Sequence, residues 1–160
     1  MRTKIVYVLV SQETDYYYEM LLLSLYSLLL YHPKGDAEVE VVMDEDTHQR
    51  LVGKKAEMLN DVTPIVVSIP PEYTVMQRSR YLKTQLRQLV KGDFLFLDCD
   101  TLICDRLDDV DNIKANVAMV SDANYILKKC SPYARELCKR AGFQDFCPRY
   151  PRIDLIIALK

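Results

Sequence analysis

The sequence contains no tryptophan and only four glycines among its 160 residues. So little glycine, with only seven prolines, excludes a collagen-like or low-complexity chain. A strong excess of either charge is also missing, because 21 Lys and Arg residues face 23 Asp and Glu residues. This balance gives no electrostatic footprint for nucleic acid, so we expect no nucleic-acid partner. The remaining composition, 49% hydrophobic and 28% charged, is typical of one soluble globular domain.

The sequence also lacks the cysteine and histidine patterns that bind metals. Its five cysteines are an odd number and include no C-x-x-C pair. No histidine lies at metal-ligand spacing from them, so neither a disulfide framework nor a zinc site is expected. Reduced thiols are typical of a cytoplasmic protein, and that is the location we expect. The two histidines, His32 and His48, stand alone in polar surroundings and are predicted at the surface.

No hydrophobic run is long enough to cross a membrane, because a spanning helix needs about 20 apolar residues. The most apolar stretch covers residues 20–31 and is interrupted by two serines. We predict that it forms a helix buried in the core. The apolar run at residues 5–10 is too short for the hydrophobic region of a signal peptide. The sequence therefore predicts no transmembrane segment, while peripheral attachment to a membrane stays open.

Continuous apolar runs alternate with helical patterns along the chain. The runs indicate buried strands at residues 5–10, 39–43, 65–68, 94–97 and 117–120. Helices are predicted at residues 15–31, 45–59, 76–90 and 132–140, and the last apolar run, 153–159, has no predicted type. This alternation predicts an α/β fold, a mainly parallel sheet flanked by helices. Ligands of such sheets bind at the carboxyl ends of the strands, here residues 11–15, 43–46 and 98–100.

Two acidic residues directly after a buried strand are the sharpest functional signal. Asp98 and Asp100 follow the strand at residues 94–97, and on an extended segment their side chains project to the same side. A divalent ion that prefers oxygen ligands fits between two such carboxylates, together with substrate phosphates. It would neutralise a diphosphate leaving group. The alternative is a solvated turn that involves Thr101.

The segment FLFLDCDTL at residues 94–102 resembles the D-x-D strand of nucleotide-sugar-dependent glycosyltransferases with the GT-A fold. The resemblance is to the retaining family that includes glycogenin and bacterial lipopolysaccharide galactosyltransferases. Further segments agree with that family in order and spacing, namely residues 6–30, 78–83, 105–109 and 118–122. The match covers roughly residues 4–125, and it implies that residues 1–125 are the donor-binding part of a GT-A domain with a Rossmann-like sheet.

The resemblance implies transfer of a hexose from a nucleotide-sugar donor, a UDP-hexose, to a saccharide or protein acceptor. It implies that Asp98 and Asp100 hold Mn²⁺ or Mg²⁺ on the donor diphosphate. Arg80, with Lys83, would contact the phosphates or the sugar, because a cation there binds phosphate and screens leaving-group charge. The full set of implied donor-binding residues is Ser11, Gln12, Arg80, Lys83, Asp98, Asp100 and Asp122.

The loop after the first strand departs from the family pattern. Ser11 and Gln12 would meet the nucleotide base, and Gln12 replaces the usual aspartate of that loop. Three tyrosines at residues 16–18 fit stacking on the base or packing in the helix. Asp122 lies where the family carries an acid near the sugar.

Beyond residue 125 the resemblance ends, and residues 126–160 are predicted as a helix plus an atypical tail. The Asn-Ser-Gly strand and the C-terminal metal-binding histidine of the family are missing. Our hypothesis is a chain truncated in its coding sequence by a frameshift at residues 146–150, which sequencing past the stop codon tests. Such a chain would bind the ion weakly and transfer slowly. Its sheet would leave an edge or face uncovered, which favours self-association.

Two other functions fit the same acidic pair. Aspartate-nucleophile phosphatases of the haloacid dehalogenase type carry a strand followed by D-x-D-x-T, and the segment after residue 97 is near that pattern. Their motif opens the domain, however, and their threonine lies two residues after the second aspartate, whereas Thr101 follows Asp100 directly. The other function is a non-catalytic nucleotide-binding fragment, which would bind UDP without transfer.

Overall fold

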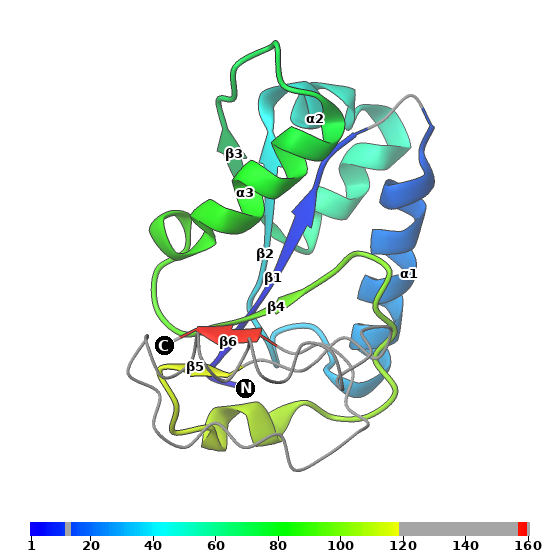
Figure 1. Cartoon of the computed structure of the whole chain (residues 1–160). Coiled ribbons are helices and arrows are strands. Elements are labelled where there is room, and N and C mark those ends of the chain that lie inside the picture. The colour runs from blue at the N-terminus through cyan, green and yellow to red at the C-terminus, as the bar shows by residue number, and fades with distance from the viewer. Residues whose placement is uncertain (12–13, 119–156, 160) are drawn as a thin grey trace, which may run out of the picture. The chain divides into compact units, whose positions relative to one another are not determined.

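A computed structural model describes residues 1–11, 14–118 and 157–159 of the chain. Within these ranges the strands form a six-stranded sheet in the order β3-β2-β1-β4-β6-β5 (Figure 1). Their bounds are β1 Lys4–Leu9, β2 Val39–Asp44, β3 Thr63–Val67, β4 Phe94–Leu97, β5 Val117–Ala118 and β6 Ile157–Leu159. The strands β3, β2, β1 and β4 run parallel, which confirms the predicted α/β class.

The last apolar run of the sequence, for which no type was predicted, contributes a strand. β6 pairs antiparallel with β4 on one side and with β5 on the other. Both edges of β4 are therefore paired, and the expectation of an uncovered edge or face of the sheet stays a prediction. The predicted boundary at residue 125 and the predicted helix at 132–140 lie outside the described residues.

The predicted helix at residues 45–59 is two shorter helices in the structure. These are α2 (Glu45–Arg50) and the 3₁₀ helix η1 (Gly53–Asn60), and Val52 between them is extended. Gly53 has a φ of 58°, which is left-handed backbone that favours glycine. The α-helix has already ended at Arg50, and Gly53 begins η1, so the helical prediction for residues 45–59 is confirmed in two separate pieces.

The two remaining α-helices, α1 (Tyr16–Tyr31) and α3 (Val75–Leu89), cover opposite faces of the sheet (Figure 1). Leu82 and Leu86 of α3 are buried in one core cluster with alternate residues of β1, Val6 and Val8. The intervening residue Tyr7 points to the other face, where its hydroxyl lies 2.9 Å from Ser24 of α1. The predicted amphipathic face of α3 is confirmed.

The helix α1 was predicted to be buried in the core, and only one side of it is. Leu21 and Leu28 are buried, together with two serines. Leucines and a tyrosine on the other side are 38–63% exposed, namely Leu22, Leu23, Tyr26, Leu29 and Leu30. The cause is that α1 is apolar all round, while the sheet can cover only one of its faces. No helix in the described part of the chain is long and apolar enough to cross a membrane.

One predicted surface histidine is confirmed and the other was wrong. His48 on α2 is exposed. His32, directly after α1, is 2% exposed. Its Nδ1 lies 3.0 Å from a carboxylate oxygen of Asp36, and its Nε2 accepts a hydrogen bond of 2.8 Å from the Leu107 backbone. A segment 75 residues later in the sequence thus covers the His32 ring, and no local sequence pattern predicts this burial.

An acidic side chain ties the start of the chain to the 3₁₀ helix η2 (Asp108–Asn112). The Asp111 carboxylate accepts hydrogen bonds of 2.8 Å from the backbone N–H groups of Arg2 and Thr3, and one of 2.7 Å from the Thr3 hydroxyl. Burial raises the pKa of Asp111, but these hydrogen bonds outweigh burial and lower that pKa from 3.8 to about 2.

This lowered pKa predicts a loss of stability in acid. A carboxyl with a depressed folded-state pKa stabilises the fold above its unfolded pKa near 4, and the benefit disappears as the pH falls towards 2. We expect Asp111→Asn to lower the free energy of unfolding by about 1–2 kcal/mol at pH 6. The difference in free energy of unfolding between wild type and Asp111→Asn, measured by urea unfolding, should become smaller as the pH falls from 4 to about 2. The exposed neighbour Asp109→Asn is the control, and a gap independent of pH would contradict the assignment.

Candidate functional site

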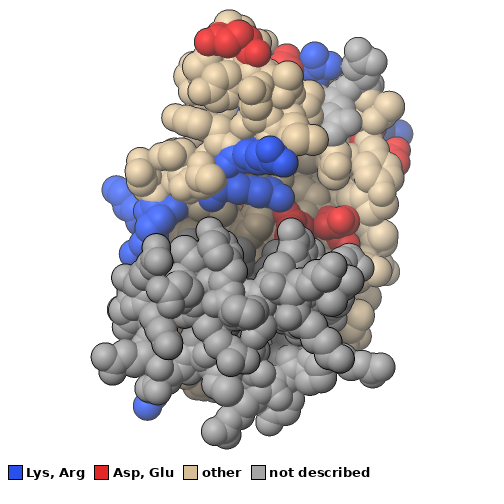
Figure 2. Space-filling view, viewed as in Figure 1, with Lys and Arg blue, Asp and Glu red and all other residues tan. Residues whose placement is uncertain are grey.

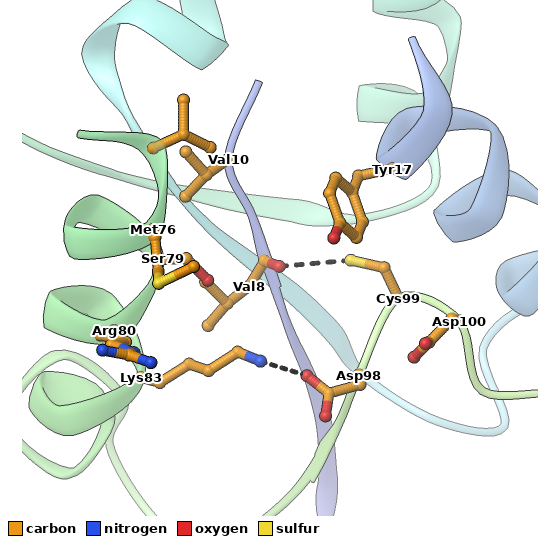
Figure 3. A pocket seen from close by; sticks show the side chains of 11 residues that line it. Val8, Val10, Tyr17, Met76, Ser79, Arg80, Lys83, Asp98, Cys99 and Asp100 are labelled. Atoms are coloured by element: carbon orange, nitrogen blue, oxygen red, sulfur yellow. Dashed lines mark hydrogen bonds and ion pairs between the residues drawn. The ribbon is translucent and has the colours of Figure 1, made fainter. Parts of the chain in front are cut away.

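A pocket of about 560 Å³ lies at the carboxyl ends of β1 and β4, one of the places where the parallel sheet predicts a ligand. One wall is α3, and the opposite wall is the segment that follows β4 (Figure 3). The lining side chains are Val8, Val10, Tyr17, Val75, Met76, Ser79, Arg80, Lys83, Asp98, Cys99 and Asp100.

The two predicted metal ligands both line this pocket, one on each side of Cys99 in the sequence. The Cys99 thiol is buried and donates a hydrogen bond of 3.2 Å to the backbone carbonyl of Val8 (Figure 3). Burial raises the pKa of this thiol to about 12, so it stays protonated at neutral pH. The residues after β4 form a turn, in which the Thr101 backbone N–H donates a hydrogen bond of 3.0 Å to the Asp98 carbonyl. The expected extended segment was therefore wrong, and the alternative of a turn that involves Thr101 is present, with Asp98 and Asp100 both lining the pocket.

Basic side chains form the opposite wall. Lys83 reaches from α3 across the pocket and makes an ion pair with Asp98 (Figure 3). The Lys83 ammonium also lies 5.4 Å from the centre of the Phe96 ring. Arg80, one turn earlier on α3, lines the same pocket and is exposed. Figure 2 shows a group of basic side chains on one side of a hollow and acidic side chains across it.

Four of the seven predicted donor-binding residues therefore meet in one pocket, and a fifth lies beside it. Ser11 follows β1, and its backbone N–H donates a hydrogen bond of 2.6 Å to the Thr47 hydroxyl. It lines a smaller adjoining hollow, which shares Val10 and Tyr17 with the pocket. Gln12 and Asp122 lie outside the described residues.

Two pocket-lining residues were not among the donor-binding residues predicted from the sequence. Tyr17 was one of three tyrosines, and only the fold shows that its side chain faces the pocket. Ser79 carries no pattern of its own, yet it lies on the pocket side of α3 because Arg80 and Lys83 do. A signal for Ser79 existed in the helical spacing, since residues four apart share a face.

The carboxylates of the pocket fit a hard divalent ion. Asp98 is one-third exposed, and one of its oxygens is held by Lys83. Asp100 is exposed and makes no hydrogen bond or ion pair within residues 1–11 and 14–118. Two aspartates from one segment, open to solvent and to substrate phosphates, are the donor set that Mg²⁺ and Mn²⁺ accept.

A second group of acidic and histidine side chains does not fit an ion. His32, Asp36 and Asp108 offer ligand atoms within 4.8 Å of one another. Arg106 donates to both carboxylates, however, and both ring nitrogens of His32 already have partners. None of the three residues lines the pocket. We assign this group to holding the end of α1 against the turn before η2.

Arg78 also lies on α3 but faces away from the pocket. Its Nη1 donates hydrogen bonds to Asp44 at 2.8 Å and to Asp46 at 3.2 Å, at the carboxyl end of β2. The Asp44 side chain, which is 3% exposed, also caps α2 by accepting a hydrogen bond of 2.7 Å from the Thr47 backbone N–H. Arg78 and Arg80 are thus two residues apart in sequence, but Arg78 binds the end of β2 whereas Arg80 lines the pocket.

The solved structures on which this chain superposes include glycosyltransferases. The galactosyltransferase LgtC, crystallised in complex with donor and acceptor sugar analogues, superposes with a TM-score of 0.60 at 14% identity over 98% of this chain. Mouse xyloside xylosyltransferase 1 in its apo form gives 0.60 at 12% identity, also over 98% of this chain. The chain spans 57% of the length of LgtC and 66% of the mouse enzyme. No family model matches, and no curated protein matches.

These likenesses establish the fold. The parallel strands β3, β2, β1 and β4, flanked by α1 and α3, form the sheet of a GT-A domain, as the resemblance of residues 94–102 implied. The identities are too low to carry an activity from either relative to this chain.

Proposed function

We propose that this chain binds the donor of a nucleotide-sugar-dependent glycosyltransferase, which transfers a hexose from a UDP-sugar to a saccharide or protein acceptor. The observation that carries the proposal is the pocket at the ends of β1 and β4. There Arg80 and Lys83 face Asp98 and Asp100 across about 560 Å³. A diphosphate bound with a divalent ion is the ligand class that needs cations and carboxylates on opposite walls.

Each charged residue has a proposed role in that complex. Asp98 and Asp100 would hold Mn²⁺ or Mg²⁺, and the ion would neutralise the charge that develops on the diphosphate leaving group. Arg80 would bind the phosphates through its fork of N–H donors. Lys83 would add a mobile positive charge beside them. These groups would stabilise departure of the diphosphate because their charges are in place before the bond between the anomeric carbon and the diphosphate oxygen breaks.

The base of the nucleotide would lie on the side of Ser11 and Tyr17. The hollow lined by Ser11 adjoins the pocket, and Tyr17 belongs to both. A tyrosine ring there offers an apolar surface on which a pyrimidine can stack. Gln12 is proposed to contact the base, and Asp122 the donor sugar.

The test is thermal unfolding with UDP in the presence and absence of Mn²⁺. At about 100 times its Kd a ligand adds about 2.7 kcal/mol of stability. For a chain of this size that raises Tm by roughly 5–10 °C. We expect the Mn²⁺-dependent part of this rise to disappear in Asp100→Asn. It should persist in Asp93→Asn, an exposed carboxylate at the opposite end of β4.

The outcomes separate the candidate functions. A chain that gives no response to any nucleotide with Mn²⁺ would contradict the proposal. If UDP stabilises the chain but the chain releases no UDP from UDP-hexoses, the result would favour the alternative of a non-catalytic nucleotide-binding fragment. The phosphatase alternative has no support from the fold, since the matched structures are glycosyltransferases. It predicts release of phosphate from a generic phosphoester, lost in Asp98→Asn.

Self-association stays a prediction, and we propose the exposed apolar side of α1 as its surface. The exposed leucines of that helix are the largest apolar group on the described surface of the sheet's flanking helices. Sedimentation velocity at increasing protein concentration measures it. A single species at the monomer mass throughout would contradict it.

A further inference from the structure

We propose that Lys83 guards Asp98 against divalent ions until a diphosphate enters the pocket, and thereby couples ion binding to nucleotide binding. The inference rests on the proposed function, because it assigns a regulatory step to the same pocket. It concerns how this chain's own cation and carboxylates exchange partners.

The first observation is that Asp98 already has a cation. The Lys83 ammonium makes an ion pair with Oδ1 of Asp98 (Figure 3). Its position is reinforced by the Phe96 ring, whose centre is 5.4 Å away. The two aspartates therefore differ: Asp98 is paired, whereas Asp100 has no ion-pair partner within the described residues.

A divalent ion and an ammonium group compete for the same carboxylate oxygen. Two cations held by one carboxylate lie within a few ångström of each other, where their repulsion is strong even in a partly exposed site. The ion therefore binds both aspartates only when Lys83 leaves Asp98. Asp100 alone, exposed and with a single carboxylate, offers a weak site.

A diphosphate gives Lys83 another partner inside the same pocket. Arg80 and Lys83 are neighbours on one face of α3, and both line the space in which the phosphates would lie. The lysine stem is flexible and its ammonium donates in any direction, so it can turn from Asp98 to a phosphate oxygen without movement of the helix. The released carboxylate then becomes free for the ion.

This exchange predicts positive coupling between the two ligands. Each ligand removes an obstacle to the other, so UDP raises Mn²⁺ affinity and Mn²⁺ raises UDP affinity by the same factor. Without Lys83 the ion finds both carboxylates free. We expect Lys83→Met to bind Mn²⁺ alone about 10-fold more tightly than wild type, and the factor by which UDP raises Mn²⁺ affinity to fall about 5-fold or more.

Electron paramagnetic resonance of free Mn²⁺ measures these affinities directly, with no need for turnover. The ion is titrated with wild type and each variant, with and without UDP. Lys83→Arg keeps the charge and should stay near wild type for Mn²⁺ alone. Lys91→Met is the matched control, because Lys91 is an exposed lysine just beyond the same helix, outside the pocket. Lys83→Gln is a second neutral variant, in case Lys83→Met folds poorly.

The outcomes distinguish the guard from the proposed function. Tighter binding of Mn²⁺ alone in Lys83→Met and Lys83→Gln, but not in Lys91→Met, together with a smaller effect of UDP on their Mn²⁺ affinity, supports the guard. If UDP binds to none of the proteins, the coupling and the proposed function are both overturned. Unchanged or weaker Mn²⁺ binding in both neutral variants overturns the guard, and the proposed function survives if wild type still binds UDP with Mn²⁺. Absence of Mn²⁺ binding in every protein overturns both.

Discussion

Arg78→Met is expected to lower the free energy of unfolding by about 3 kcal/mol, because it leaves a buried carboxylate without its cation. Arg78 donates to Asp44 at 2.8 Å, and the Asp44 side chain is 3% exposed. Asp44 ends β2 and caps α2, so it cannot turn to solvent without loss of that cap. Urea unfolding at neutral pH measures the change.

The neighbouring arginine supplies the control for this prediction. Arg80 lies on the same helix, is exposed, and makes no ion pair within the described residues. Arg80→Met should change stability by no more than about 0.5 kcal/mol. Equal losses in the two variants would show that Arg78 stabilises the fold only through its place in α3, and not through Asp44. UDP affinity should show the opposite pattern: Arg80→Met should weaken UDP binding more than Arg78→Met does.

Phe94→Ala is expected to lower the free energy of unfolding by about 3–5 kcal/mol, the cost of a large cavity in a packed core. Phe94 is fully buried at the start of β4, in one cluster with Leu82 and Leu86 of α3. The Tm should fall by about 10 °C for a chain of this size. Leu102→Ala, at a side chain that is 56% exposed, is the control and should cost little. A loss below about 1 kcal/mol in Phe94→Ala would contradict close packing of α3 on β4.

This second prediction also bears on the pocket. β4 leads directly into Asp98, and α3 carries Lys83, so the packing of Phe94 against α3 sets the distance between the two walls. Below the Tm of Phe94→Ala, we expect Mn²⁺-dependent binding of UDP to weaken although every charged residue remains. An unchanged affinity for UDP would show that contacts other than the packing of Phe94 on α3 hold the two walls of the pocket in place.

Where local pattern carried enough information, the sequence was a sufficient guide. β1 and β4 are continuous apolar runs because both faces of a parallel sheet are covered, and both were predicted. The face of α3 with Leu82 and Leu86 followed from helical spacing. The position of Asp98 and Asp100 at the open end of a strand followed from their place directly after β4.

Prediction failed where the outcome depended on residues far apart in the chain. α1 is apolar on every side, so its composition could not show which side the sheet would cover. His32 is buried by a backbone segment 75 residues later. The division of residues 45–59 depended on the non-helical backbone at Leu51 and Val52, which composition does not reveal.

The α/β class, the GT-A resemblance and the acidic pair were predictable before folding was considered, because each depends on periodicity or on adjacent residues. The residues that face the acidic pair, in contrast, are known only from the folded chain. The tertiary structure placed Lys83 on Asp98 and left Asp100 open. It also turned Arg78 to Asp44 while Arg80 lines the pocket. The pairings of Lys83 with Asp98 and of Arg78 with Asp44 join different elements, so their geometry exists only after α3 has packed on the sheet.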